Sequence, residues 1–310
     1  MVTDFIHEPV LFEEVLTALQ PVNGGFYVDG TVGGGGHAEA ILEASSPDGF
    51  LLGFDRDDWA LKASAKRLAR FGHRLELQRE VFAGIAKHLG NRQCDGVLLD
   101  LGVSSPQLDE AERGFSFQSN GPLDMRMDRR QSVTAEQLIN ELEQEELASI
   151  FWELGGERRS RRIARAIVEQ RDMQRLITTE QLSKVVERVC PRQGAKKHPA
   201  TGVFQALRMV VNNELMQVEV GLEECWSALK PGGRMAVITF HSGEDRMVKQ
   251  FNRRMTNPYE LKGQVDLPEW REPRKPLARE LRRKAIKPSE LEIKRNPRSR
   301  SAQLRVLEKI

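Results

Sequence analysis

Apolar and polar positions follow a repeating pattern over the first hundred residues. Four short segments typical of strands, at 26–30, 50–55, 74–78 and 94–102, are mostly apolar and are separated by segments with helical spacing, such as 37–44. Apolar runs without a polar face are typical of strands covered on both sides, and alternation of strand and helix is typical of a parallel sheet. This part of the chain therefore predicts an α/β fold with helices on both faces of a parallel sheet.

The pattern changes after the fourth apolar run and returns later in the chain. Residues 109–207 are polar with helical spacing, which predicts a helical insertion of about a hundred residues. The earlier pattern resumes with a long helix at about 205–229, a turn at 230–233 and a strand at 234–240. The insertion therefore interrupts one α/β domain.

The last residues of the chain complete that domain. Residues 302–309 alternate apolar and charged positions, which predicts a strand. We expect this strand to lie beside 234–240 in the sheet. The predicted organisation is a discontinuous α/β domain at 1–108 and 208–310, with a helical domain at 109–207.

Composition agrees with this arrangement and excludes other classes of protein. The chain has 310 residues, of which 39% are hydrophobic and 30% are charged, as in a globular protein with a sizeable core. No apolar stretch approaches about 18 residues, so we expect no membrane partner. Acidic residues near the start are unlike the basic start of a secretory signal, so we expect a cytoplasmic location. Cys94, Cys190 and Cys225 are too far apart for a zinc site, and we expect no metal.

Charge is unevenly distributed along the chain. The formal net charge is only +2, but residues 268–310 hold 14 Lys and Arg against 6 Asp and Glu. A basic segment on a slightly acidic body suggests a polyanionic partner. A solvated tail without a partner would have the same composition, and charge alone leaves both interpretations open.

A dense run of glycines marks the first strand-to-helix turn. Residues 30–36 include five glycines, and Gly33, Gly35 and Ala38 fit the loose pattern GxGxxA. In doubly wound sheets, ligands bind beyond the carboxyl ends of the strands, where glycine permits positive φ and close approach of a ligand. The pattern predicts a ligand-binding turn, although a tight turn without a ligand can also be rich in glycine.

The second predicted strand narrows the class of ligand. It ends in Asp55, twenty residues after Gly35, where a carboxylate can accept hydrogen bonds from both ribose hydroxyls of an adenosine. Asp57 and Asp58 follow and can cap the next helix instead. The pattern up to this point favours a nicotinamide dinucleotide or S-adenosylmethionine.

The fourth predicted strand favours S-adenosylmethionine. It places Asp100 at its carboxyl end, before a loop at 101–106 that contains Gly, Ser and Pro. Methyltransferases that act on exocyclic amino groups place an acidic or amide residue there, in a short loop that holds the target nitrogen. A dehydrogenase would need a proton donor such as Tyr, and the chain has only Tyr27 and Tyr259. We therefore expect a methyltransferase.

The chain also resembles a known family along nearly its whole length. It is similar to the bacterial small-subunit ribosomal RNA cytosine-N4 methyltransferases, which have a Rossmann-like class I methyltransferase sheet with an inserted helical domain. The segments that carry the resemblance are HEPVLFEEVL, YVDGTVGGGGH, GFDRD, LLDLGVSSPQLDEAERGFSF, GPLDMRMD, ERRSRRIARAIVE, KKHPATGVFQALRMVVNNEL, LKPGGRMAVITFHSGEDRMVK and NPRSRSAQLRVLEK. One departure is Gly243, where the family usually has Leu, and we expect it to loosen that loop.

The resemblance implies a donor site, a reaction and a partner. The implied activity is methyl transfer from S-adenosylmethionine to the N4 amine of a cytidine in 16S ribosomal RNA. The implied substrate is the assembled small subunit, the insertion is the implied RNA-recognition domain, and a homodimer is plausible for the family. The residues that match the family's donor contacts are Gly35, Gly36, His37, Asp55, Phe82, Asp100 and Gln107.

Asp100 is the candidate catalytic residue. The lone pair of the cytosine N4 amine is conjugated with the ring, so the reaction needs the nitrogen to be held in line with the S–CH3 bond. A nearby carboxylate can stabilise the positive charge that develops on the nitrogen. The sequence leaves open whether Asp100 contacts the amine or only the donor.

Basic residues outside the donor motifs are candidates for RNA binding, since Lys and Arg bind phosphate. A solvated helix surface is the alternative for each of them. Two further functions also stay open at this point, a methyltransferase acting on DNA, another RNA or protein glutamine, and a non-catalytic RNA-binding assembly factor. The candidate residues are Arg158, Arg159, Arg162, Lys196, Lys197, His198, Arg282, Arg283 and Lys284.

Overall fold

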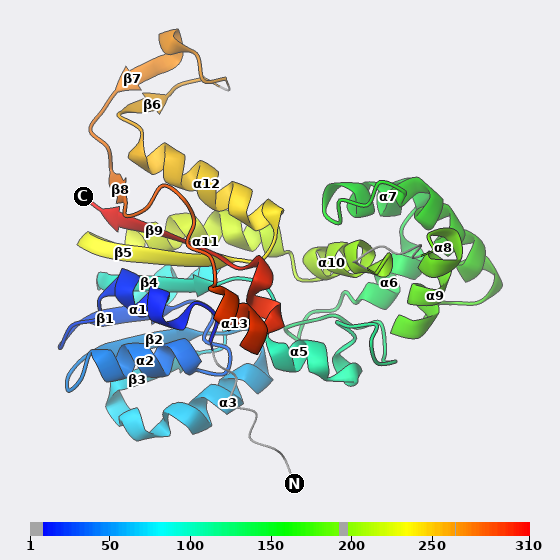
Figure 1. Cartoon of the computed structure of the whole chain (residues 1–310), viewed down its shortest axis with the longest axis horizontal. Helices are drawn as coiled ribbons and strands as arrows, with labels where there is room; N and C mark the ends of the chain where they lie inside the picture. Colours follow the sequence, from blue (N-terminus) through cyan, green and yellow to red (C-terminus); the bar gives the residue numbers. More distant parts are fainter. Residues whose placement is uncertain (1–8, 192–197, 264) are drawn as a thin grey trace. The chain divides into compact units, whose positions relative to one another are not determined.

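The computed structural model describes residues 9–191, 198–263 and 265–310, and the chain forms two compact units (Figure 1). The sheet unit comprises the residues up to Gly102 together with 216–310, and the helical unit comprises 103–215. The boundaries therefore differ by several residues from the positions expected from the sequence. Within the described residues, no helix has both the length and the apolar character needed to cross a membrane.

The sheet unit is built on seven strands. The strand order is β3-β2-β1-β4-β5-β9-β8, and the first five strands of this order run parallel to one another. This is the doubly wound order with an antiparallel strand, β9, near one edge. The predicted Rossmann-like α/β fold is confirmed. The strands are β1 (Phe26–Asp29), β2 (Phe50–Phe54), β3 (Leu75–Gln78), β4 (Cys94–Asp100), β5 (Leu229–Thr239), β8 (Ala278–Glu280) and β9 (Gln303–Lys309).

Helices cover both faces of the sheet because successive residues of each strand point to opposite sides. In β4, Val97 and Leu99 are buried in one core and Leu98 is buried in the other. The Leu98 side is covered by α1 (Phe12–Leu19), α2 (Gly36–Ala44) and α3 (Asp58–Leu68). The Val97 side is covered by α4 (Ala86–Leu89), α11 (Glu214–Ala228) and α12 (Ser242–Thr256).

Three further elements belong to the sheet unit. A separate two-stranded hairpin follows α12 and extends away from the main sheet (Figure 1). It consists of β6 (Tyr259–Leu261) and β7 (Arg271–Pro273). A short helix, α13 (Glu290–Arg295), precedes the last strand.

The start of β5 differs from the prediction of a turn followed by a strand. The strand begins at Leu229 and includes residues 230–233. The pairing with β4 passes directly from Cys94–Leu229 to Gly96–Arg234, so those four residues bulge out of the ladder. Gly232 has φ of +79°, a conformation that favours glycine. The glycines therefore allow a bulge inside the strand.

The helical unit packs around its own core. The core includes fully buried side chains such as Ile139, Phe151, Ile163 and Leu182. Several helices start at a capping box, as at Thr178, whose side-chain oxygen accepts a hydrogen bond from the Gln181 amide. The helices are α5 (Ser105–Asp109), α6 (Ala135–Glu141), α7 (Gln144–Glu153), α8 (Ser160–Met173), α9 (Thr179–Val189) and α10 (Ala200–Val211).

The predicted single helix at 205–229 is wrong, because the structure has two helices there. α10 ends at Val211 and α11 begins at Glu214. The Asn212 side chain donates to the Met125 carbonyl at 2.7 Å and accepts from the Met127 amide at 2.8 Å. Asn213 then adopts φ of +50°. These hydrogen bonds to a distant segment hold Asn212 at the break, which apolar spacing alone does not reveal.

The last strand is where the sequence predicted it. β9 pairs antiparallel with β5, with Leu304 opposite Ile238 and Val306 opposite Ala236. Both β9 side chains are buried in the core on the α1 side of the sheet. β9 thus contributes both hydrogen bonds and core packing to the sheet.

We expect Leu304→Ala to lower the free energy of unfolding by about 2–5 kcal/mol, because it leaves a cavity beneath α1. Denaturant unfolding measures this change. Ile310→Ala is the control, since Ile310 is 68% exposed just after the same strand and its replacement should cost little. A loss below about 1 kcal/mol for Leu304→Ala would contradict the role of β9 in the core.

Candidate functional site

The candidate site lies in the sheet unit, at the carboxyl ends of three adjacent strands. β1 lies between β2 and β4 in the sheet. Asp29 ends β1, Asp55 follows β2 and Asp100 ends β4. Because parallel strands end at the same edge of a sheet, the three acids come from segments far apart in the sequence to one edge.

The turn that contains the five glycines of residues 30–36, called the glycine turn below, connects these strand ends. Gly30 donates to the Leu98 carbonyl before β4 ends, and Val32 donates to the Phe54 carbonyl at the end of β2. A Cβ on Gly30 would lie 2.4 Å from Leu99, so glycine is required there by close packing. The turn is therefore held between the two neighbouring strands.

Asp55 is bonded to the glycine turn. Its carboxylate accepts from the Gly33 amide at 3.0 Å and from the Asp57 amide at 2.8 Å. Gly33 has φ of +50°, a backbone conformation that residues other than glycine rarely adopt. This conformation directs its amide toward Asp55. Burial raises the pKa of Asp55 to about 6, although the two amides lower it. Asp55 thus fixes the turn and leaves further lone pairs for a ligand.

Thr31 connects Asp29 to Asp100. The Thr31 amide donates to Asp29 at 3.0 Å, and the Thr31 hydroxyl oxygen accepts from the Asp100 amide at 2.6 Å. Asp29 is 1% exposed, and burial raises its pKa to about 7. Burial also raises the pKa of Asp100 to about 8, with further contributions from the negative charges of Asp29 and Glu244.

Asp100 has an unused acceptor atom. Within the described part of the chain, its Oδ1 is buried without a hydrogen-bond partner, and none of the three acids forms an ion pair. A buried acceptor without a partner is costly unless a ligand satisfies it. After Asp100, Gly102 adopts φ of +103° and its backbone approaches the Phe240 ring. The edge can therefore accept a cation or an N–H donor.

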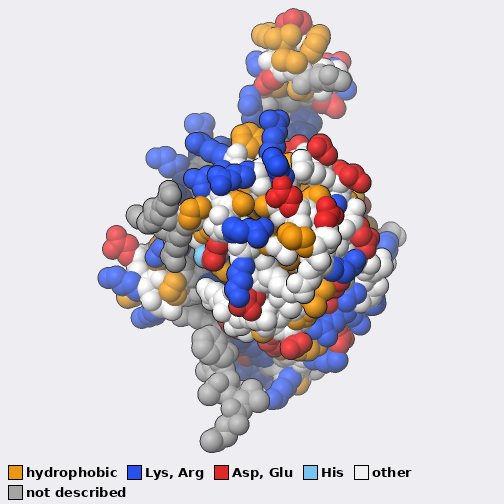
Figure 2. All heavy atoms as spheres, turned by 90° about the vertical axis from the view of Figure 1, so that its right-hand side faces the viewer, with side chains coloured by type: hydrophobic (Ala, Val, Ile, Leu, Met, Phe, Trp, Pro, Cys, Tyr) orange, Lys and Arg blue, Asp and Glu red, His pale blue; other side chains and the backbone are white. Residues whose placement is uncertain are grey.

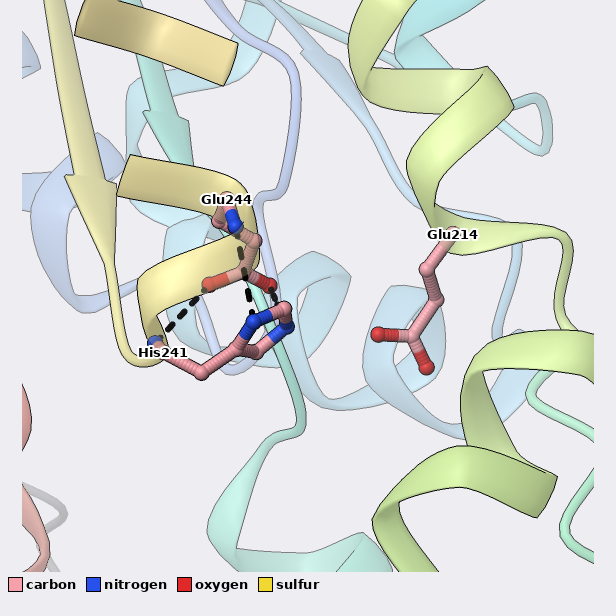
Figure 3. Close-up of side chains that lie close together, drawn as sticks. All are labelled: Glu214, His241 and Glu244. Atoms are coloured by element: carbon pink, nitrogen blue, oxygen red, sulfur yellow. Dashed lines mark hydrogen bonds and ion pairs between the residues drawn. The ribbon is translucent and has the colours of Figure 1, made fainter. Parts of the chain in front are cut away.

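The start of α12 is held by a capping box beside this edge. The buried Glu244 carboxylate accepts from the Phe240 amide at 2.9 Å, and the Glu244 amide donates to His241 Nδ1 at 3.4 Å (Figure 3). The His241 Nε2 atom lies 3.0 Å from Glu244 Oε1. Figure 3 also draws Glu214, which belongs to the helical unit and is held there by the Arg208 guanidinium.

Gly243 lies in the first turn of α12 and not in a loop. A glycine inside a helix costs about 1 kcal/mol relative to Ala. The capping box formed by His241 and Glu244 holds this turn in the helix. The sequence showed that Gly replaces the family's usual Leu at position 243, but it did not show that this position lies in a capped helix.

The remaining candidates of the sheet unit lie at the start of α2 and in the short 3-10 helix Phe82–Gly84 after β3. Gly35 is the N-cap of α2 with φ of +81°, and Gly36 and His37 form its first turn. The His37 ring is 7% exposed and stacks on Phe12 with 6.3 Å between ring centroids. Phe82 is also 7% exposed and packs against the backbone of α11 at Gly221. Both rings are therefore mainly buried within the unit.

Gln107 lies in the helical unit and has a local partner. Its side-chain oxygen accepts from the Ser104 amide at 3.0 Å, as part of the capping box of α5. It is 5% exposed. The structure thus brings Asp55, Asp100 and the glycine turn together within one unit and assigns Gln107 to the other.

The basic candidates differ in how freely they could reach a ligand. Arg158, Arg159 and Arg162 are exposed at the start of α8, and Arg282, Arg283 and Lys284 are exposed between β8 and α13. Basic and acidic side chains are both distributed over the face shown in Figure 2. Lys196 and Lys197 lie outside the described residues. His198 stacks on Phe117, with 4.4 Å between ring centroids, and accepts from the Ala200 amide, so its ring is engaged within the helical unit.

Comparison with known proteins gives this edge of the sheet a chemical context. The sequence profile of the MraW methylase family matches residues 4–310, which is nearly the whole chain. The chain belongs to the MraW methylase family. This membership makes the glycine turn and the three acids a candidate methyl-donor site.

Two curated relatives match at similar levels, and both are named ribosomal RNA small subunit methyltransferase H. The chain is 49% identical to the one from Symbiobacterium thermophilum, over 99% of this chain and 97% of the relative. It is 51% identical to the one from Syntrophotalea carbinolica, over 99% and 98%. A solved structure of a putative rRNA-methylase from Clostridium thermocellum has a TM-score of 0.48 and 13% identity, over 99% of this chain and 100% of that one.

Sequence reasoning missed two residues of this edge, Asp29 and Thr31. Asp29 directly precedes the glycine run, and an acid between an apolar strand and a glycine turn is a signal that could have identified it. Thr31 has no comparable signal, because its role depends on the amide of Asp100, 69 residues later in the chain.

The raised pKa values predict how stability depends on pH. In the unfolded chain these acids ionise near 3.8, whereas in the folded protein Asp29 and Asp100 ionise near 7 and 8. Their contribution to the free energy of unfolding is therefore full below about pH 4 and falls as pH rises toward 8.

Asp29→Asn should flatten the fall in unfolding free energy between pH 5 and 8, because Asn keeps the acceptor for the Thr31 amide but does not ionise. Urea unfolding at several pH values measures the slope. Asp48→Asn, at an exposed position of the same unit, is the matched control and should leave the slope unchanged. An equal slope in wild type and Asp29→Asn would show that Asp29 titrates normally.

Proposed function

We propose that this protein transfers a methyl group from S-adenosylmethionine to the N4 amine of a cytidine in small-subunit ribosomal RNA. The observation that carries the proposal is the match of about half of all residues, over 99% of the chain, to relatives named ribosomal RNA small subunit methyltransferase H. The acids and the glycine turn of the sheet unit supply groups that suit this chemistry.

The donor site suits a sulfonium compound. S-Adenosylmethionine carries a positive sulfonium and an ammonium group, and the edge presents three acids that form no ion pair among the described residues. Asp55 is the proposed acceptor of hydrogen bonds from the ribose hydroxyls. Gly35, Gly36 and His37 would contact the donor at the start of α2, and Phe82 and Gln107 are further proposed contacts. A Cβ on Gly34 would meet nothing within 4 Å, so the turn leaves space for a ligand.

Asp100 is the proposed catalytic residue. In the reaction, the S–CH3 bond breaks with its electron pair left on the sulfur, the N4 lone pair forms the N4–CH3 bond, and the proton lost from the nitrogen passes to the Asp100 carboxylate. The unpartnered Oδ1 of Asp100 can accept a hydrogen bond from the amine and stabilise the charge that develops on it. The approach of the sulfonium favours the ionised form of Asp100, which is the form that accepts. The Thr31 hydroxyl oxygen holds the backbone of Asp100 in place for this role.

The start of α8 is the proposed contact with RNA phosphates in the helical unit. Helix N-termini favour negative charge, yet the first turn of α8 has no acidic residue and is surrounded by Arg158, Arg159 and Arg162. Within the described residues these arginines form no ion pair with an acid. The Glu157 side chain accepts from the Arg159 amide, and a phosphate would pair with the arginines and be favoured by the positive end of the helix dipole. Arg282, Arg283 and Lys284 are the corresponding candidates in the sheet unit, and Lys196, Lys197 and His198 are further candidates.

Methyl transfer to small subunits tests the proposed reaction. We expect small subunits from cells lacking this modification to accept labelled methyl groups, and nucleoside analysis of their RNA to show N4-methylcytidine. Asp100→Asn should reduce turnover by about 100-fold or more, as expected for loss of an electrostatic contact to the reacting group. Unfolding measurements serve as the control for folding.

The product decides between the possible functions. If the label is found on another nucleoside or on protein, that group is the target in place of cytidine N4. If no small-subunit preparation becomes labelled, the protein binds RNA without catalysing methyl transfer. Wild-type turnover in Asp100→Asn would contradict the placement of the reacting amine at β4.

Donor affinity tests the role of Asp55. Asp55→Asn should weaken S-adenosylmethionine binding by about 1–3 kcal/mol. The reason is that Asn has one acceptor oxygen, whereas the two ribose hydroxyls of the donor would use both oxygens of the Asp55 carboxylate. Calorimetry measures the change. Asp58→Asn is the control, since Asp58 is a nearby acid that pairs with Lys62 on α3. Unchanged affinity in Asp55→Asn would exclude Asp55 from the donor site.

A further inference from the structure

The helical unit contains a groove that the proposed donor site does not use. It lies between α8 and α9, two helices that pack side by side (Figure 1). Its volume is about 260 Å³. Sites for drug-sized ligands span roughly 300–1,000 Å³, so this groove suits a group of about one nucleotide. Its lining residues are Gln170, Gln174, Arg175, Leu176, Gln181, Lys184, Val185 and Arg188.

The groove has an apolar floor and amide walls. Leu176 and Val185 are 2% and 5% exposed and belong to the core of the unit. Gln170, Gln174 and Gln181 contribute amides, which carry donors and an acceptor on one planar group. The Gln181 oxygen is already used by the Ile177 and Thr178 amides, so its NH2 group is the part left for a ligand.

The charge of the lining is entirely basic. Two of the three cations are held by acids outside the lining, Arg175 by Glu136 at 2.9 Å and Lys184 by Glu180 at 2.6 Å. Arg188 forms no ion pair among the described residues, and its Nη1 lies 3.4 Å from the side-chain oxygen of Gln170. Its guanidinium therefore keeps most of its donors for an anion.

We propose that this groove binds a single-stranded segment of the RNA substrate, with a phosphate at Arg188 and Lys184 and a base over Leu176 and Val185. This inference rests on the proposed function, which supplies the RNA. Single-stranded RNA presents an unstacked base and a phosphate together, and proteins read such bases through their polar edges. The glutamine amides match those edges, because the NH2 groups of Gln170 and Gln181 can donate and the Gln174 amide can both donate and accept.

An acidic peptide would also meet the cations, but it would use the apolar floor and the three amides less fully. A peptide carboxylate is an acceptor only and has no flat ring to cover the apolar floor, whereas a base combines a flat ring with an edge that offers both donors and acceptors. The combination of amides, apolar floor and cations therefore favours a nucleotide. Arg188 in the last turn of α9 could serve only to complement the helix end, and the experiment below distinguishes this role.

Binding of a short single-stranded RNA to the full chain, measured over a salt series, tests the proposal. Arg188→Ala should weaken binding about three- to tenfold at low salt and make the dependence of log K on log salt shallower by about 0.7, as for loss of one phosphate contact on a single strand. Gln174→Glu, which places a negative charge in the groove without changing its shape, should weaken binding at least as much.

Arg165→Ala is the matched control. Arg165 is an exposed arginine of α8 outside the groove, and it is paired with Glu169. It should leave the salt dependence close to that of wild type. Affinity for S-adenosylmethionine and the free energy of unfolding should be unchanged in the Gln174→Glu variant, which separates a binding defect from misfolding.

The outcomes separate this inference from the proposed function. RNA affinity and salt dependence equal to wild type in both groove variants, with wild-type methylation of small subunits, would overturn the groove and leave the reaction intact. Loss of RNA affinity in the groove variants supports the groove even if wild-type protein methylates no subunit, in which case the proposed reaction fails by itself. Displacement of RNA by an acidic peptide at equal affinity would contradict the preference for a nucleotide.

Discussion

Strand β1 is hydrogen-bonded to β2 along one edge and to β4 along the other, and the candidate site depends on this arrangement. The ladder aligns the carboxyl ends of the three strands, so that Asp29, Asp55 and Asp100 meet at one edge. Thr31 and Gly33 then connect the turn after β1 to the acids of both neighbours. Burying three acids together is costly for the free protein, and their raised pKa values express that cost. A cationic donor would offset it, which links the fold to the proposed chemistry.

Features encoded by local patterns were predicted well from the sequence. β1, β2, β4 and β5 were found because buried parallel strands are apolar runs, and β9 was found because its residues alternate, whereas the short strands β6, β7 and β8 were not predicted. Features that depend on distant partners were missed. Asn212 ends α10 through hydrogen bonds to Met125 and Met127, and Thr31 holds an amide of β4. Asp55 and Asp100 were identified because each ends an apolar run, while the groove between α8 and α9 needs two helices to be packed together before it exists.

The two units divide the work of the proposed reaction. The sheet unit presents acids and a glycine turn, which suit a small cationic donor, whereas the helical unit presents cations, amides and a helix start, which suit RNA. Because the proposed donor site is acidic and the proposed RNA site is basic, the cationic donor is disfavoured at the RNA site and the anionic RNA is disfavoured at the donor site. Such a division suits an enzyme whose two substrates differ greatly in size and carry charges of opposite sign at their recognised groups.

The split of the sheet unit into two segments has a consequence for folding during synthesis. The helical unit is contiguous and can form its core as soon as residue 215 has left the ribosome. β4 waits longer, because its second partner, β5, is made more than a hundred residues later, and β9 must still insert between β5 and β8. Contacts between such distant segments form slowly, since closing the long loop costs entropy first. The open edge of β4 is thus exposed to wrong pairing until β5 has been made.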